Sequence, residues 1–495
     1  MPDTLLRIDR ADPESAPLSD KHTASRGPQQ PGGGRREAAP PAPLELTSRK
    51  KRFTTDGGHR TVSPEETLAN YAHLINPLTG IVRRLVPLVP APNGLIHAYG
   101  AVYQTPPAGP PPLRHGGLET AGGKGKTDVQ ARTSALCEAL ERYSRIYQGY
   151  EPVRRASYKD LGEAAVHPNA CMNFSARQYQ HREALNAART TPKDWIPAPF
   201  DESADIAWTP AWSLTHETFK YVPTAYCYAR YRGPGHAFCV ADANGNAAGN
   251  TLEEAIVQGF LELAERDSVA LWWYNRVRAP AVDLQSFGEP YFLDLQAYFR
   301  SLGRALWVLD LTTDLGIPVF AALSRRQDKP QEDILFGFGA HFDAQLGIQR
   351  ALTELNHFIP ATLRIEHGHA TPEEALDGPT RRWWREATLA NQPYLAPHPT
   401  CPPKTASDYP PCRHDDLLDD VRLCARSVER RGMDMLVLDQ TRPEIGLNVV
   451  KVMTPGLRHC WRRLGPGRLY DVPPQLGWRQ EPLQEHLVNP VPMVF

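Results

Sequence analysis

The sequence predicts a mixed α+β fold, and two observations support this prediction. Runs rich in β-branched and aromatic residues alternate with runs whose apolar residues recur at helical spacing. The alternation also lacks the regular βαβ period of a doubly wound parallel sheet. The expected strands are residues 80–89, 206–214, 305–311, 319–323, 435–438 and 449–453. With 495 residues, 41% of them hydrophobic, the chain is long enough for two or three domains or for one large one.

The beginning of the chain differs from the rest in composition. Nine of the seventeen residues from Gly27 to Pro43 are Gly or Pro, and few are apolar. Such a segment buries too little apolar surface to offset the entropy lost on ordering. We therefore expect residues 1–60 to form a disordered tail and residues 61–495 to form the folded domain. The basic run Arg49–Arg52 in this tail is interpreted as solvated.

Two helices can be placed by local boundary signals. Ser63 precedes Pro64 and stands three residues before Glu66, a combination of N-cap, N1 proline and capping-box glutamate that predicts a helix from residue 64 towards residue 76. Near the C-terminal end, apolar residues at helical spacing predict a second helix from about residue 415. This helix should end at Gly432, since glycine is the preferred residue just after a helix.

Charge and hydropathy exclude several classes of protein. The 55 Lys and Arg residues nearly balance the 56 Asp and Glu residues, so no basic excess points to a nucleic-acid or membrane partner. No apolar run approaches the length of a membrane-spanning helix, and the first residues lack the pattern of a secretory signal. The eight cysteines include no CxxC pair and are interpreted as reduced thiols. We expect a cytoplasmic protein.

An internal repeat is the most informative feature. Gly125–Ser144 recurs as Gly249–Ser268 at a separation of 124 residues, with seven of twenty positions identical. About one identity in twenty is expected by chance, so common descent or a common constraint is the better explanation. Thr127 and Thr251 each precede a helical pattern and have a Gln or Glu three residues later, which predicts two capping boxes and two helices that start in the same register.

The repeated helices each carry a polar face. Residues at positions i, i+4 and i+7 of a helix share one face; here they are Ser134, Glu138 and Glu141 in the first copy, and Gln258, Glu262 and Glu265 in the second. The second helix is apolar nearly all round, so its carboxylates should point into the protein. Buried carboxylates need a compensating cation, and Mg²⁺ takes oxygen ligands and bridges carboxylates to phosphates. The pattern predicts a Mg-nucleotide site.

Two other interpretations apply to these segments. Glu138 with Arg142, and Glu262 with Arg266, have the i,i+4 spacing of ordinary helix ion pairs, although the matched repeat favours a site. Thr120–Thr127 (TAGGKGKT) ends like a phosphate-binding P-loop but has Thr120 where the motif needs its first glycine, and we see no strand before it. We therefore expect a flexible loop whose amides and Lys124 can still meet a phosphate.

Several segments resemble one protein family. The strings GGKGKTDVQARTSALCEALERYS and GNTLEEAIVQGFLELAERDSVALWW are similar to the hallmark segments of the YcaO family of ATP-dependent enzymes that modify peptide backbones. Residues 337–356, 439–458 and 489–495 (NPVPMVF) follow in the order seen in that family, so the resemblance covers about residues 61–495. It implies a YcaO-like α+β fold in which an internally duplicated helix and sheet unit surrounds a Mg-ATP site.

The resemblance also implies roles for particular residues. Ser134, Glu138, Gln258 and Glu262 correspond to ATP-binding positions, and Lys124, Arg276 and Arg350 to phosphate-contacting ones. The implied magnesium ligands are Glu138, Glu141, Glu262 and Glu265. The ending is similar to that of azoline-forming members, with Pro490 and Pro492 remaining from a longer PxPxP tract. It implies a catalytic contribution from these prolines and from the carboxylate of Phe495.

The implied activity is cyclodehydration of a ribosomally made precursor peptide. A Cys, Ser or Thr side chain attacks the preceding amide, ATP phosphorylates the resulting oxyanion, and loss of phosphate leaves an azoline. Two alternatives stay open: a YcaO thioamide synthetase that uses a sulfide donor, and a non-catalytic ATP-binding subunit. The polar tail is unlike a folded recognition module, so we expect a separate E1-like or leader-peptide-recognition partner. An FMN-dependent azoline dehydrogenase acting later and a homodimer are further expectations.

Overall fold

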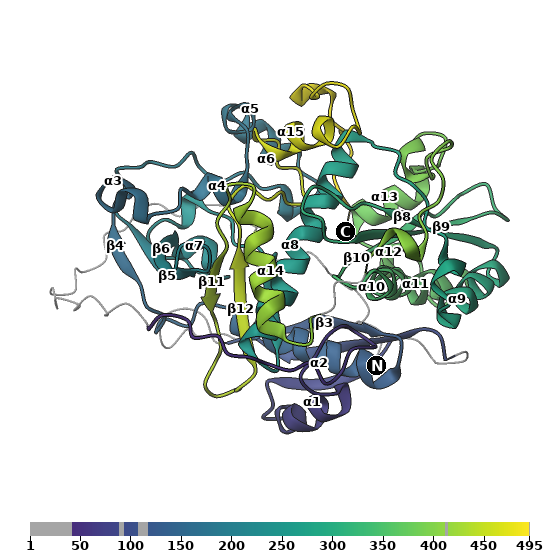
Figure 1. Cartoon of the computed structure of the whole chain (residues 1–495), viewed down its shortest axis with the longest axis horizontal. Helices are drawn as coiled ribbons and strands as arrows, with labels where there is room; N and C mark the ends of the chain where they lie inside the picture. The colour runs from purple at the N-terminus through teal and green to yellow at the C-terminus, as the bar shows by residue number, and fades with distance from the viewer. Residues whose placement is uncertain (1–41, 89–93, 107–116, 411–413, 495) are drawn as a thin grey trace.

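The computed structural model describes residues 42–88, 94–106, 117–410 and 414–494, and it contains three antiparallel sheets (Figure 1). The first sheet has the order β1(Val82–Pro87), β2(His97–Gln104), β3(Leu118–Gly125). The second has the order β10(Leu335–Ala340), β9(Val319–Arg326), β8(Arg304–Asp310). The third has the order β4(Arg154–Ala156), β5(Ile206–Ser213), β11(Leu436–Asp439), β12(Asn448–Met453), β7(Asn246–Gly249), and β6(Thr218–Pro223) pairs with β5. The α+β prediction is confirmed, and each of the six expected strands is present.

Helix α8(Leu252–Asn275) runs through the centre of the molecule. Figure 1 shows β11, β12 and α14 on one side of it, the β8–β10 sheet on the other, and α1, α2 and β3 below. The helix is buried along nearly its whole length, as its all-round apolar pattern predicts, and Trp272 and Trp273 are fully enclosed. The main core cluster forms around this helix.

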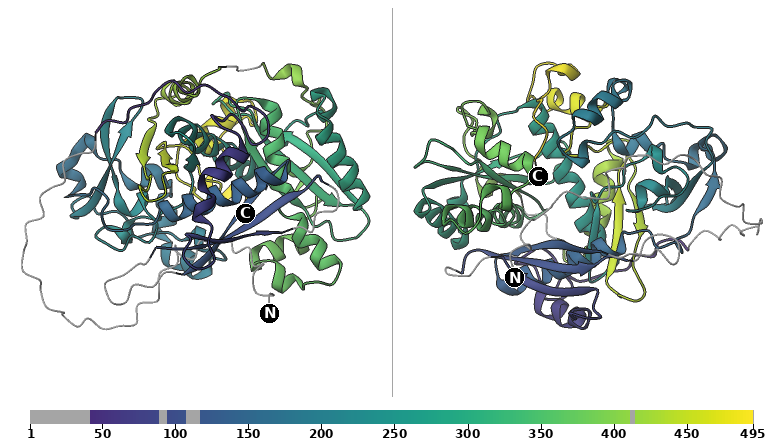
Figure 2. Two further views of the ribbon diagram at one scale, coloured as in Figure 1. Left: turned by 90° about the horizontal axis from the view of Figure 1, so that it is seen from below. Right: turned by 180° about the vertical axis from the view of Figure 1, so that it is seen from behind.

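The other helices lie around this core and are also visible in the views of Figure 2. They are α1(Pro64–Tyr71), α2(Asp128–Ser144), α3(Tyr158–Leu161), α4(Pro168–Met172), α5(Ala176–Gln180), α6(Arg182–Ala188), α7(Thr224–Cys227), α9(Pro290–Ser301), α10(Ala344–Asn356), α11(Ile359–Glu366), α12(Pro372–Ala375), α13(Gly378–Glu386), α14(Leu417–Glu429) and α15(Arg468–Gln475). Helices α1 and α14 start and stop close to the predicted positions. Within the described ranges, none of the helices combines the length and the apolar character needed to span a bilayer.

Three strand–helix units share one construction. Strands β3, β7 and β10 are each the terminal strand of their sheet, and each is followed within four residues by a helix, respectively α2, α8 and α10. The side chains of Thr127, Thr251 and Asp343 cap these helices by accepting bonds from backbone N–H groups of the first turn. The repeat found in the sequence lies on the first two units, and β10–α10 is a third unit of the same kind.

Glycines allow each of these strands to contact its helix directly. A Cβ atom on Gly123 would lie 2.1 Å from the backbone nitrogen of Ala135, and one on Gly339 would lie 2.2 Å from the carbonyl oxygen of Gly347. The segment Thr120–Thr127 therefore lies largely in strand β3, and the prediction of a flexible loop is wrong. The strand was missed because close packing on a helix requires glycines, which are otherwise rare in strands.

The capping boxes form only in part. Thr127 and Thr251 accept the expected backbone bonds from Gln130 and Glu254. The Glu254 side chain, however, accepts bonds from the backbone and hydroxyl of Thr61 and from the side chain of Asn250 instead of returning a bond to its own cap. The distant Thr61 and the neighbouring Asn250 have replaced the local half of the motif.

Residues 42–60 are ordered, in contrast to the expected disorder up to residue 60. Lys51 forms an ion pair of 2.6 Å with the buried Asp420 of α14, and Arg49 pairs with Glu253 of α8 at 3.5 Å. The backbone of Thr47 also donates to Glu253, over 2.7 Å. Leu44 and Leu46 also pack against the main core, but most of the contacts of this segment are polar and reach buried carboxylates, so its composition did not reveal its order. The remainder of the expected tail, residues 1–41, lies outside the described residues.

Asp56 is the central anchor of this segment. Its buried carboxylate accepts bonds from the backbone of Lys126 and Thr127, from the Thr127 hydroxyl and from Gln349 of α10. Replacement by alanine leaves these donors without an acceptor, and we expect a loss of about 2–4 kcal/mol in the free energy of unfolding. Urea denaturation of Asp56→Ala, with the exposed Asp294→Ala as control, measures this; equal midpoints would contradict it.

Candidate active site

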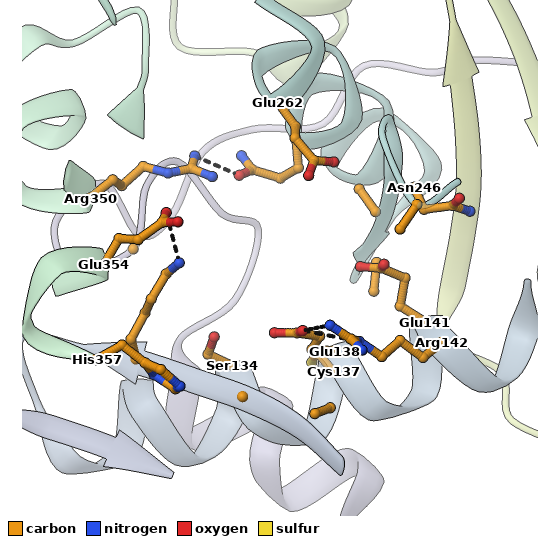
Figure 3. A pocket seen from close by; sticks show the side chains of 18 of the residues that line it. Ser134, Cys137, Glu138, Glu141, Arg142, Asn246, Glu262, Arg350, Glu354 and His357 are labelled. Atoms are coloured by element: carbon orange, nitrogen blue, oxygen red, sulfur yellow. Dashed lines mark hydrogen bonds and ion pairs between the residues drawn. The ribbon is translucent and has the colours of Figure 1, made fainter. Parts of the chain in front are cut away.

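One cavity of about 620 Å³ lies where helices α2, α8 and α10 meet (Figure 3). Its wall also includes strand residues of the first sheet, residues 240–250, residues 460 and 461, and Met493 near the chain end. All but one of the predicted ATP and magnesium residues line it: Lys124, Ser134, Glu138, Glu141, Gln258, Glu262, Glu265 and Arg350. Residues that are up to 226 positions apart in the sequence are therefore brought into one site.

The three helices contribute residues at equivalent positions. The seventh residues are Ser134, Gln258 and Arg350, and the eleventh are Glu138, Glu262 and Glu354, counted from the first residue of each helix. The fourteenth residues of α2 and α8 are Glu141 and Glu265, and the corresponding position on α10 is its C-cap, His357. Glu354 and His357 also line the cavity, and neither was predicted from the sequence. Aligning the third helix on its Asp343 cap would have found them, because the cap sets the helix register.

The carboxylates from α2 and α8 crowd one part of the cavity. Burial, together with the charges of Glu138 and Glu262, raises the pKa of Glu141 well above its ordinary value. Burial also raises the pKa of Glu262, although Arg266 opposes the shift, and it raises the pKa of Glu265 to about 7. A divalent cation bound between these oxygens would relieve the repulsion, so the donor set fits Mg²⁺.

The i,i+4 ion pairs that were the alternative to a metal site also form. Arg142 lies 2.7 Å from Glu138, and Arg266 lies 3.2 Å from Glu262 and 2.7 Å from Glu265. Glu141 has no ion-pair partner within 4.0 Å in the part of the chain that the structure describes. The pKa of Glu141 stays raised although the charges of Arg142 and Arg145 oppose the shift, so the ion pairs do not exclude a cation site.

Basic groups face the carboxylates across the cavity. Lys124 forms an ion pair of 2.9 Å with Glu354, and a guanidinium nitrogen of Arg350 donates to the Gln258 amide oxygen over 2.8 Å. Burial lowers the pKa of Arg350, so its charge is only partly compensated by its neighbours. Figure 3 shows Arg350, Glu354 and His357 together on one side and Glu138, Glu141 and Arg142 on the other. This arrangement fits a nucleotide whose phosphates lie between a cation and the basic side.

Because the carboxyl pKa values are raised, magnesium binding should release protons. The folded chain binds these protons more tightly than the unfolded chain does, so the metal-free protein should lose stability as the pH rises from 4.5 through about 7. Mg²⁺ competes with the same protons, and its affinity should rise about tenfold per pH unit for each proton released in that range. Calorimetric titration at pH 6, 7 and 8 measures this; a constant affinity would contradict it.

Arg276 is not part of the cavity. It follows the last residue of α8, where it is exposed and adopts a left-handed backbone conformation with φ 50°. Fourteen residues separate it from Glu262, which corresponds to about 21 Å along a helix. The phosphate-contacting role inferred from its position in the sequence is therefore not supported by its location.

The chain end reaches the cavity through Met493. The Asn489 backbone donates to the Tyr274 carbonyl over 2.8 Å, and the Trp273 indole donates to the Val491 carbonyl, also over 2.8 Å. These bonds fix the tail against the end of α8. Met493, 4% exposed, then lines the cavity, whereas Pro490 is exposed and Pro492 is half-buried outside the lining. Phe495 lies outside the described residues.

Cys137, which precedes Glu138 on α2, also borders the cavity. Burial raises the pKa of its thiol to about 12. The thiolate is therefore scarce at neutral pH, and the side chain acts as a packing group rather than as a nucleophile.

Comparison with known proteins places this site in a family. Residues 122–458 match the family model described as YcaO cyclodehydratase, ATP- and Mg²⁺-binding. The chain belongs to the YcaO family. ATP and Mg²⁺ are the cofactors of this family, in agreement with the donor set of the cavity.

Solved structures support the same assignment. A heterocyclase in complex with substrate and cofactor is 51% identical to this YcaO chain, with a TM-score of 0.85 over 92% of this chain and 60% of that one. The heterocyclase TruD is 48% identical, with a TM-score of 0.73 over 92% and 56% of the respective chains. The YcaO protein of Methanopyrus kandleri, bound with AMPPCP and Mg²⁺, is 20% identical and shares the fold, with a TM-score of 0.60 over 83% and 94%. This chain thus spans about 60% of the length of the two heterocyclases.

Proposed function

We propose that this protein is an ATP-dependent cyclodehydratase that converts Cys, Ser or Thr of a ribosomally made precursor peptide into a thiazoline or oxazoline. The observation that carries the proposal is the cavity itself, in which two carboxylate-bearing helices face Lys124, Arg350 and the chain end. The identity of 51% to a heterocyclase solved in complex with substrate and cofactor supports the same chemistry.

Different residues are proposed to bind the metal and the phosphates. Glu138, Glu141, Glu262 and Glu265 would hold Mg²⁺, while Lys124, Ser134, Gln258 and Arg350 would contact the nucleotide. When bound, ATP supplies the phosphoryl group and Mg²⁺ offsets its negative charge. The protein has little covalent chemistry of its own to perform, and the fixed carboxylates and cations contribute mainly orientation and charge stabilisation.

The proposed reaction forms and breaks bonds at one amide of the peptide. The sulfur or oxygen of the side chain bonds to the preceding amide carbon, its proton passes to a base, and the carbonyl electron pair moves to oxygen. That oxyanion takes the γ-phosphoryl group as ADP leaves. Cleavage of the C–O bond releases phosphate, and loss of the amide proton gives the C=N bond of the azoline. We propose the Phe495 carboxylate as the base. We also propose that Pro490 and Pro492 direct the tail towards the cavity.

Mass spectrometry of peptides tests this function. A panel of synthetic peptides, each with one Cys, Ser or Thr, is incubated with the full chain and MgATP, with and without an E1-like partner protein. Loss of one water per peptide, accompanied by ADP formation, is expected. An oxygen-to-sulfur mass gain that requires added sulfide would favour a thioamide synthetase instead. ATP binding without any modification in every combination would favour a non-catalytic subunit.

The assembly partners are part of the same proposal. We propose that an E1-like or leader-peptide-recognition protein delivers the precursor, and that an FMN-dependent azoline dehydrogenase can act afterwards. Low turnover by this chain alone, raised by the partner, is the expected result in the same assay. High turnover on a full precursor without a partner would contradict it. Sedimentation of the purified chain tests the proposed homodimer.

A further inference from the structure

The cavity extends beyond the residues that fit ATP and magnesium. Its far wall includes Lys193, Trp461, Arg463 and Met493, and none of these belongs to the three strand–helix units. The nucleotide and the metal account for the helices α2, α8 and α10. A second region with its own chemistry therefore remains within the same cavity.

Trp461 is the centre of this second region. Its ring stacks on the ring of His459, with centroids 5.7 Å apart and planes at 11°, and the Lys193 ammonium lies 5.5 Å from its centroid. The side chain is 9% exposed, and the indole N–H has no acceptor among the residues that the structure describes. A buried donor of this kind is usually paired, and a bound ligand group is one explanation for its lack of a partner.

Arg463 also has a buried N–H donor without an acceptor among the described residues. One of its terminal nitrogens donates to the Lys193 carbonyl over 2.9 Å, and the guanidinium lies 4.1 Å from the ring centroid of Phe174 and 5.9 Å from that of Trp461. The other terminal nitrogen has no acceptor in the described ranges, although the residue is only 3% exposed. Asp194 and Asp242 balance part of its charge from a longer range.

This region lies next to the proposed metal site. Cys460 precedes Trp461 and lines the cavity, and its thiol is subject to the charges of Lys193 and Arg266 as well as those of Glu262 and Glu265. Met493 brings the chain end to the same wall. A group bound against Trp461 would therefore lie between the carboxylates and the tail, where the reacting amide must lie.

We propose that Lys193, Trp461 and Arg463 form the subsite that binds the reacting amide of the peptide substrate. The cationic and N–H groups would bind the amide oxygen, whose negative charge grows as the side chain adds to the carbon. Trp461 and Met493 provide apolar walls for the flanking residues. This inference rests on the proposed function, since it assigns the peptide end of that site.

Two conservative variants test the subsite. Trp461→Phe removes the indole N–H but keeps an aromatic ring, and Lys193→Met removes the ammonium from a half-buried side chain. The exposed Lys159→Met is the matched control. The rate of water loss is measured with the panel peptide that wild type converts best, and nucleotide affinity is measured separately with ADP and Mg²⁺.

We expect both variants to lower kcat/KM for the peptide at least tenfold while the Kd for ADP stays within twofold. Restoring the charge with Lys193→Arg should recover part of the loss, which a purely structural role would not predict. Unchanged peptide kinetics, or an equal loss of nucleotide affinity, would overturn the subsite. Failure of the wild-type chain to modify any peptide would instead overturn the proposed function, so the two failures are distinguishable.

Discussion

Replacing Glu262 by glutamine should abolish ATP-dependent modification of the peptide while the fold is retained. Glu262 lies at the eleventh position of α8 and lines the cavity with Glu141 and Glu265, with which we propose that it shares a cation. Glutamine keeps the size of the side chain and can still accept the bond of 3.0 Å from the Gly245 backbone. We expect a fall of about 10²–10³-fold or more in the rate of water loss, the scale of removing one group that stabilises the transition state.

The same substitution should not destabilise the metal-free protein. Burial raises the pKa of Glu262, so the neutral amide avoids a cost that the carboxylate carries. Thermal unfolding without Mg²⁺ should occur at an equal or higher temperature, and stabilisation by MgATP should be lost. Glu373→Gln, whose carboxylate is exposed, is the control and should behave as wild type. Retention of activity by Glu262→Gln would contradict the assignment of the metal site.

Shortening the C-terminal tail should produce the second large effect. Removal of residues 492–495 keeps the Asn489 and Val491 anchors but deletes Met493, which lines the cavity, and also Phe495, whose carboxylate we propose as the base. A general base contributes about 10²–10⁴-fold to a rate, and we expect a loss of that order in peptide modification. Because the nucleotide-contacting residues come from other elements, the Kd for MgATP should remain within about twofold of wild type.

A chain extended by one glycine after Phe495 separates the two contributions of the tail. The extension keeps Met493 and both prolines but moves the terminal carboxylate away by one residue, about 3.5 Å at most. If the carboxylate is the base, this variant should lose nearly as much activity as the truncation. If only the packing of Met493 matters, it should keep most of its activity, and the role of Phe495 would be rejected.

Local patterns in the sequence were sufficient for much of the site. The faces that carry Glu138 and Glu262 follow from helical periodicity, and the caps at Thr127 and Thr251 set their register. These relations involve residues within a few positions of each other, so they do not depend on how distant parts of the chain pack. In the structure both faces line one cavity.

Long-range packing decided the rest. The β10–α10 unit was not predicted from the sequence. Arg350, Glu354 and His357 occupy positions equivalent to those on α2 and α8, but Arg350 and His357 differ from their counterparts chemically. Arg276 looked like a site residue in the sequence but lies at the far end of a long helix. The segment around Asp56 looked disordered because its order comes from hydrogen bonds and ion pairs to residues hundreds of positions away.

The sequence by itself thus determined the chemistry of two helix faces, the strands rich in β-branched residues and the family resemblance. The tertiary structure alone determined which basic residues face those carboxylates, how the chain end reaches them and which side chains surround Trp461 in the same cavity. The physical reason is the separation in sequence over which each feature depends on other residues. Periodicity and capping are local properties of the backbone, whereas a cavity depends on side chains that only the packing of distant elements brings together.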